Sequence, residues 1–148
     1  MSEDVIRPES EYLRLAMAES NIIERLRELL IKLGDEVDEV YEAANDLFRN
    51  RYEALKARFE KIRRYKREFE ELYRHSMFYL VRVGIGLQHR DVYARIYLGL
   101  LRFSESIETV GFRFVELAEA KASIDDDIVL GVQRFLEYVR NSLSQLET

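Results

Sequence analysis

The chain has 148 residues, a formal net charge of -5 and no cysteine. This length is enough for one domain with a core of its own. Hydrophobic residues make up 47% and charged residues 34%, which excludes the composition of a disordered chain. The lack of cysteine excludes a disulfide scaffold, a thiolate zinc site and a cysteine nucleophile. One proline and six glycines are too few for the many turns of a β-sandwich or barrel.

The first helical segment is defined by an apolar seam with alternating spacings of four and three residues. Such a seam is typical of helices packed in a left-handed bundle. Asn21 followed by Glu24 resembles a capping box and predicts the start of the main helix. A short helix is predicted from Pro8 to about Ala18, either separate from the main helix or fused with it. The seam residues are Leu26, Leu30, Leu33, Val37, Val40, Ala44 and Leu47.

Two further segments show the same helical periodicity. The second is predicted from about Tyr52 to Val83 and ends at Gly84, because glycine commonly follows the C-terminus of a helix. Its apolar face comprises Leu55, Phe59, Ile62, Phe69, Leu72, Leu80 and Val83. The third begins near Arg90. Its predicted seam comprises Ile96, Leu100, Phe103, Ile107, Val110, Phe114 and Leu117.

A fourth helix is predicted over residues 123–147. Ser123 is its expected N-cap, and three aspartates follow in the first turn, where the helix dipole favours anions. Its predicted seam comprises Ile128, Val132, Phe135, Val139 and Leu146. Short connections near residues 50, 84–89 and 122–124 require antiparallel neighbours. The sequence therefore predicts an all-α protein with a single domain over 1–148, an antiparallel up-and-down bundle of three long helices plus a C-terminal fourth helix.

Metal-binding patterns are weak in this chain. A ferritin-type site needs histidines three residues after glutamates, and neither His75 nor His89 meets this requirement. An all-carboxylate site stays open, because the first and third helices are rich in acids that could supply oxygen ligands. Most such carboxylates belong to a solvated helix face.

The second helix carries a basic run that forms a candidate patch for an anion or a partner. Basic patches of this kind attract phosphates and nucleic acids. A turn near Asn50, however, would place the acidic half of the first helix opposite this run. Asp35 or Asp38 is then expected within salt-bridge reach of Arg63, Arg64, Lys66 or Arg67, and we favour this charge pairing over nucleic-acid binding. The patch residues are Arg58, Arg63, Arg64, Lys66 and Arg67.

No catalytic motif is present in the sequence. Neither a Gly-x-Ser-x-Gly elbow, a P-loop nor a dinucleotide fingerprint occurs, so we predict no catalytic residue and no cofactor. The acidic N-terminus leads into no apolar signal segment, and no run of about 18 apolar residues exists. We therefore expect a non-enzymatic, cytoplasmic protein without membrane insertion.

The third helix, from Tyr93 to Glu119, resembles a helix of the PhoU family of phosphate-transport regulators. The residues in step with the family pattern are Arg95, Arg102, Ile107, Glu108, Val110, Gly111, Leu117, Ala118 and Glu119. The stretch from Leu33 to Phe48 is similar to the first helix of that family. The resemblance covers about residues 22–120 and implies a PhoU-like bundle, with residues 123–147 as an additional helix.

The resemblance also implies that a metal cluster has been lost. PhoU domains that bind metal use acids one turn apart, and the positions of this degenerate motif are Glu105, Glu108 and Asp38. Four residues after Glu108 stands Phe112, which cannot ligate a metal. We therefore predict no metal at these positions.

The expected function is that of a non-enzymatic regulator or adaptor in phosphate uptake or signalling. It would dock helix faces onto a protein partner, such as a transporter or sensor component. One three-helix repeat instead of two, together with nine tyrosines and eight phenylalanines, predicts a homodimer. Two alternatives stay open: a carboxylate-metal or anion-binding helical bundle, and a homodimeric bundle of unrelated ancestry.

Overall fold

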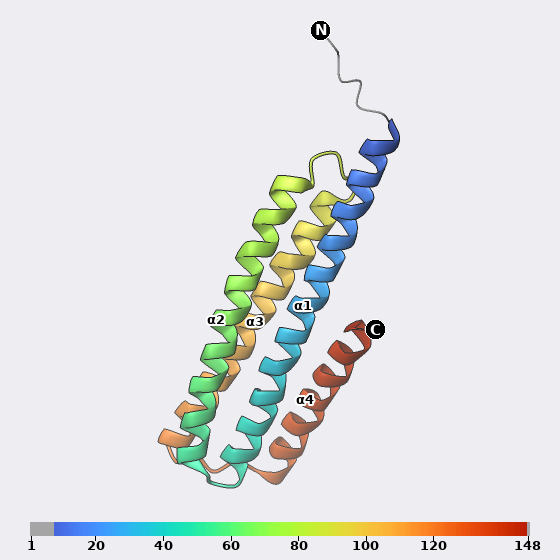
Figure 1. Cartoon of the computed structure of the whole chain (residues 1–148). Helices are drawn as coiled ribbons and strands as arrows, with labels where there is room; N and C mark the ends of the chain where they lie inside the picture. The colour runs from blue at the N-terminus through green and yellow to red at the C-terminus, as the bar shows by residue number, and fades with distance from the viewer. Residues whose placement is uncertain (1–7, 148) are drawn as a thin grey trace.

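The computed structural model describes residues 8–147 and is built from four helices (Figure 1). These are α1 (Pro8–Phe48), α2 (Tyr52–Val83), α3 (Arg90–Glu119) and α4 (Asp126–Glu147). Over residues 8–147 no strand is present, which confirms the prediction of an all-α bundle. Among these four helices, none is long and apolar enough to cross a bilayer.

Helix α1 is the central element of the bundle. Its 41 residues extend about 60 Å at 1.5 Å per residue. It packs against α2, α3 and α4, and α2 also packs against α3. Helix α4 has 22 residues and covers the C-terminal half of α1, so the N-terminal half of α1 rises well beyond it (Figure 1).

Side-chain contacts fix the helix directions. Tyr93 of α3 donates to Glu19, and Tyr97 donates to the carbonyl of Ile22, so α3 runs alongside α1 in the same direction. Gln133 of α4 donates to Asn45 at 3.0 Å, whereas Arg140 lies 2.6 Å from Asp38. Rising numbers on α4 therefore meet falling numbers on α1, so α4 runs antiparallel to both α1 and α3.

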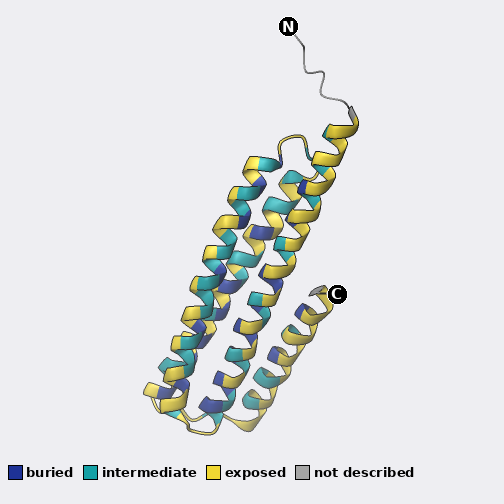
Figure 2. Cartoon of the chain, viewed as in Figure 1, coloured by how far each residue is buried: buried dark blue, intermediate teal, exposed yellow. Residues whose placement is uncertain are grey.

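The core follows the seam predicted on α1. Six of the seven seam residues are buried, and Leu26 is half-buried. The buried residues Leu55, Ile62 and Phe69 of α2 belong to the same core cluster, and buried positions lie along the length of the bundle (Figure 2). Helices α2 and α3 pack closely at Gly111, where a Cβ would come within 3.2 Å of the Ile62 side chain. The first three helices therefore form a tightly packed unit.

The predicted breaks between helices are confirmed, but two predicted caps are not. Helix α1 continues through Asn21, whose side chain donates to the Tyr79 hydroxyl instead of capping a helix, so the predicted short helix is fused with the main one. Ser123 was expected to cap α4. The helix instead begins at Asp126, and the carbonyl of Asp125 accepts its first backbone hydrogen bonds. Ser123 therefore lies outside the helix.

The predicted seam of α4 is wrong in part. Leu136 and Leu143 are the buried residues of this helix, while Phe135 is 66% exposed. Val132 and Val139 are half-buried, and Ile128 and Leu146 are also exposed. The helix is rotated because Leu136 and Leu143 share a stripe with the two valines and together offer a more continuous contact with α1.

The predicted seam of α3 is shifted in a similar way. Its buried residues are Tyr97, Ser104, Ile107, Gly111, Phe114 and Ala118. Ile96, Val110 and Leu117 of the predicted seam are partly exposed. Helix α3 thus carries two adjacent apolar stripes, and the first three helices bury one of them.

Candidate functional site

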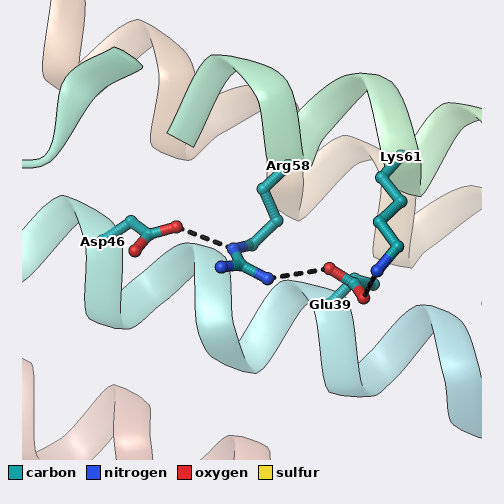
Figure 3. A network of polar contacts seen from close by, with 4 residues as sticks. All are labelled: Glu39, Asp46, Arg58 and Lys61. Carbon is teal, nitrogen blue, oxygen red and sulfur yellow. Dashed lines mark hydrogen bonds and ion pairs between the residues drawn. The ribbon is translucent and has the colours of Figure 1, made fainter. Parts of the chain in front are cut away.

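The basic run of α2 meets the acids of α1 through one compact network (Figure 3). The Arg58 guanidinium lies 2.7 Å from an Asp46 oxygen and 3.0 Å from a Glu39 oxygen. Lys61 Nζ lies 2.7 Å from the other Glu39 oxygen. Burial alone would lower the pKa of Arg58, but the hydrogen bonds to the two carboxylates outweigh it and raise that pKa. The network therefore holds α1 and α2 in one register.

The predicted register between α1 and α2 is confirmed, but the prediction that Asp35 or Asp38 pairs with the basic run is wrong. Residue 39 lies opposite residue 61, as a turn near Asn50 requires. Asp38, however, contacts Arg140 of α4, because it is one residue, or about 100°, further around α1 than a residue facing α2. Asp35 lines a cavity with Arg140 on the same side. Neither aspartate reaches the basic run.

The five residues of the candidate anion patch are not one open stripe. Arg58 is held by two carboxylates, and Lys66 lies 3.0 Å from both Glu70 and Glu108. Arg63 lies on the surface near Glu60, and Arg64 stands over the Tyr65 ring. Arg67 is exposed. The interpretation as an anion site stays a prediction, and the geometry assigns Arg58 and Lys66 to structural pairing.

The three positions of the degenerate metal motif are separated in space. Glu108 accepts from Lys66 of α2, whereas Asp38 faces Arg140 of α4. Glu105 is exposed. Across residues 8–147, no group of three or more histidine, aspartate or glutamate side chains is placed to hold a metal ion.

A buried carboxyl group, not predicted from the sequence, lies between α1 and α3. The side chain of Glu36 is fully buried between α1 and α3, and the Ser104 hydroxyl donates to its Oε1 at 2.7 Å. Its Oε2 meets no hydrogen-bond partner among the described residues. Burial raises the pKa of Glu36 to about 8, and the nearby Glu108 raises it as well, while the Ser104 hydrogen bond lowers it. The buried position of Glu36 therefore favours its protonated form.

An apolar groove separates α3 from α4. Within the described residues α4 packs on α1 but not on α3, and a cavity of about 340 Å³ lies between these two helices. Val37 and Val40 of α1 form its floor. Its walls are Phe103, Ser106, Ile107, Val110 and Phe114 of α3 and Val132, Phe135, Leu136 and Val139 of α4. The Ser106 side chain supplies the single polar group of this lining.

Part of the rim of the groove is also apolar. Tyr138 is 78% exposed, and it lines a second cavity of about 410 Å³ together with Phe103 and Phe135. Ile128 continues the same face of α4 toward its N-terminus. A contiguous exposed apolar surface of this kind marks an interaction site on a protein. We therefore take the groove between α3 and α4 as the candidate functional site.

The fold and the groove define a class of protein, a four-helix all-α bundle with an open apolar face. No protein-family model, curated protein or solved structure matches the chain. The resemblance to the PhoU family stays a prediction from the sequence.

Proposed function

We propose that the chain is a non-enzymatic regulator or adaptor, acting in the cytoplasm, that receives an amphipathic helix of a protein partner. The groove between α3 and α4 carries this proposal, because its apolar floor and walls would be filled by one face of a helix.

The shape of the groove favours a helix over a small molecule. Its two walls are long helices that lie side by side, and both apolar walls continue beyond the cavity itself. A helix laid between them would contact three helices at once, as helices in bundles do. Phe135 and Tyr138 are suited to anchor it, because aromatic side chains provide most of the binding energy in many interfaces.

Charge at the rim specifies the partner helix further. Arg95 and Arg102 directly precede Ile96 and Phe103 on α3, and both arginines are exposed. They therefore flank the apolar face on its outer side. A helix with an apolar face and acidic flanking residues complements this arrangement.

The biological process we propose is phosphate uptake or signalling, with a transporter or sensor component as the partner. This part of the proposal is supported by the resemblance of α3 and of the first helix to the PhoU pattern. The groove supports helix docking independently of the process.

Affinity purification from the source organism with matched variants tests the proposal. Val110→Glu places a charge in the groove at a partly exposed position, and Arg64→Glu changes an exposed residue of α2 as a control. We expect one partner to be retained by the wild type and by Arg64→Glu and lost by Val110→Glu. Hydrogen exchange on the purified complex should then slow in α3 and α4. A partner that Val110→Glu captures equally well would overturn the proposal.

A further inference from the structure

Helices α3 and α4 carry the same short sequence. Ile96–Phe103 reads Ile-Tyr-Leu-Gly-Leu-Leu-Arg-Phe, and Ile128–Phe135 reads Ile-Val-Leu-Gly-Val-Gln-Arg-Phe. The two stretches are identical at five of eight positions, namely the isoleucine, the leucine, the glycine, the arginine and the phenylalanine. Spacings of three and four place the isoleucine, glycine and phenylalanine on one face of each helix, called here the Ile-Gly-Phe face.

Packing among the described residues leaves both Ile-Gly-Phe faces largely uncovered. Ile96, Ile128 and Phe135 are exposed, and Phe103 is half-buried at the groove. Among the described residues, a Cβ at Gly99 or Gly131 would meet no side chain and no atom of another helix within 4 Å. Glycine inside a helix is unfavourable relative to alanine, and no contact within the described chain requires it at these positions. It does allow the backbone of another helix to come close.

The two faces cannot pair along their length within one chain. Because α4 runs antiparallel to α3, both phenylalanine ends lie at the groove, where Phe103 and Phe135 line the same cavities. The isoleucine ends point in opposite directions along the bundle. The first half of α3 and the N-terminal part of α1 thus extend beyond the reach of α4 (Figures 1 and 2). In that part of α1, Tyr12, Leu13 and Met17 are exposed.

We infer that the helix received at this site is α4 of a second copy of the chain. A two-fold axis perpendicular to the bundle makes the two copies antiparallel, so the partner's α4 runs parallel to α3. The two Ile-Gly-Phe faces then match in register, with glycine against glycine and phenylalanine beside phenylalanine. The same contact occurs twice, and each α4 supplies the helix that the other copy lacks beside the first half of α3.

This inference rests on the proposed function, since it names the occupant of the same groove: the second copy's α4 takes the place that a transporter or sensor helix would otherwise fill. The repeated sequence is the argument for a second copy over an unrelated partner, because a two-fold dimer brings these two stretches together. Burying two phenylalanines and two isoleucines at each of two equivalent contacts provides the central apolar cluster that a stable interface needs.

Cysteine cross-linking tests the arrangement, because the chain has no cysteine of its own. Single variants Gly99→Cys and Gly131→Cys are mixed in equal amounts and oxidised. Facing glycines fall within the Cα separation of about 4.4–6.8 Å that a disulfide spans. We expect a linked dimer in the mixture. The control replaces Gly99→Cys with Glu105→Cys, which is exposed on the opposite side of α3, and its mixture should stay unlinked.

Mass measurement by analytical ultracentrifugation completes the test. The wild type should sediment at twice 17.6 kDa at micromolar concentration. Phe135→Glu should raise the dimer dissociation constant at least about 30-fold, equal to about 2 kcal/mol, with the helix content unchanged. A monomeric wild type, a dimer that Phe135→Glu leaves intact, or equal linking through Glu105→Cys would overturn the second copy as occupant. If the wild type is monomeric yet Val110→Glu abolishes partner capture, the proposed function stands without the dimer.

Discussion

The Ser104 hydroxyl donates a 2.7 Å hydrogen bond to Glu36 Oε1 inside the contact between α1 and α3. It is the one hydrogen bond that the structure gives to this buried carboxyl, whose second oxygen is unpaired among the described residues. A charged carboxylate in such a place is unfavourable, whereas a protonated carboxyl is tolerated. The packing of α1 against α3 is thereby linked to proton binding at one residue.

The free energy of unfolding should fall as the pH rises from about 4.5 to about 8. The pKa of Glu36 is raised from 4.5 to about 8, so the unfolded state loses this proton first and the folded state binds more protons in between. At about 1.4 kcal/mol per pKa unit, the full loss is at most about 5 kcal/mol. Urea unfolding of the wild type and Glu36→Gln across this range measures it.

The variant Glu36→Gln should match the wild type near pH 4.5 and exceed it in stability near pH 9, because an amide does not ionise. Glu105→Gln, at an exposed position of α3, is the control and should follow the wild-type profile. Parallel profiles for the wild type and Glu36→Gln would contradict the assignment of a raised pKa to Glu36.

Removing the hydroxyl donor of Ser104 should lower the free energy of unfolding and raise the pKa of Glu36. Ser104→Ala leaves both Glu36 oxygens without a partner, which costs roughly 1–3 kcal/mol. Because the Ser104 hydrogen bond lowers the pKa of Glu36, its loss should raise that pKa further and extend the pH-dependent loss of stability to higher pH. The carboxyl resonance of Glu36 in an NMR titration reports this directly. An unchanged midpoint in Ser104→Ala would show that the hydrogen bond does not hold the pKa down.

The four helices and the breaks between them could be predicted from the sequence. The regular apolar seam of α1 and the glycines after Val83 are local sequence signals, and they predict where a helix runs and where it ends. The rotation of α3 and α4 was not predictable, because each helix carries two adjacent apolar stripes and periodicity cannot choose between them. The choice depends on which stripe fits α1, and that is a property of packing.

The buried Glu36 was hidden for a related reason. It belongs to a run of acids from Asp35 to Asp46 that reads as a solvated face. One signal was available, because Glu36 is three residues after Leu33 and four before Val40 and so shares their inward side. The matching Ser104 on α3 is polar on a buried stripe, but only the structure brings the two residues together.

Two neighbouring substitutions on α4 test which stripe is buried. Leu136 is 6% exposed, so Leu136→Ala should lower the free energy of unfolding by roughly 2–5 kcal/mol. Phe135→Ala should change it by less than about 0.5 kcal/mol in the monomer, because this ring is largely in solvent. Both are measured by denaturant unfolding at concentrations low enough to keep the chain monomeric. The reverse order of effects would mean that α4 is rotated by about 100° from its position here.

The Arg58 network should contribute more to stability than any exposed ion pair of the bundle. Arg58→Met keeps much of the aliphatic stem but leaves Asp46, which is buried, and Glu39, which is largely buried, without their shared cation. Lys61 still contacts Glu39, so Asp46 is the carboxylate that loses its cation. We expect the free energy of unfolding to fall by about 2 kcal/mol, which is less than for a fully buried pair because Arg58 is partly exposed.

Arg63→Met is the matched control, since its contact with Glu60 is a 3.5 Å pair on the surface. It should change the free energy of unfolding by less than about 0.5 kcal/mol. Urea unfolding at low and at high salt compares the two variants, and equal effects would show that the network adds no more than a surface pair.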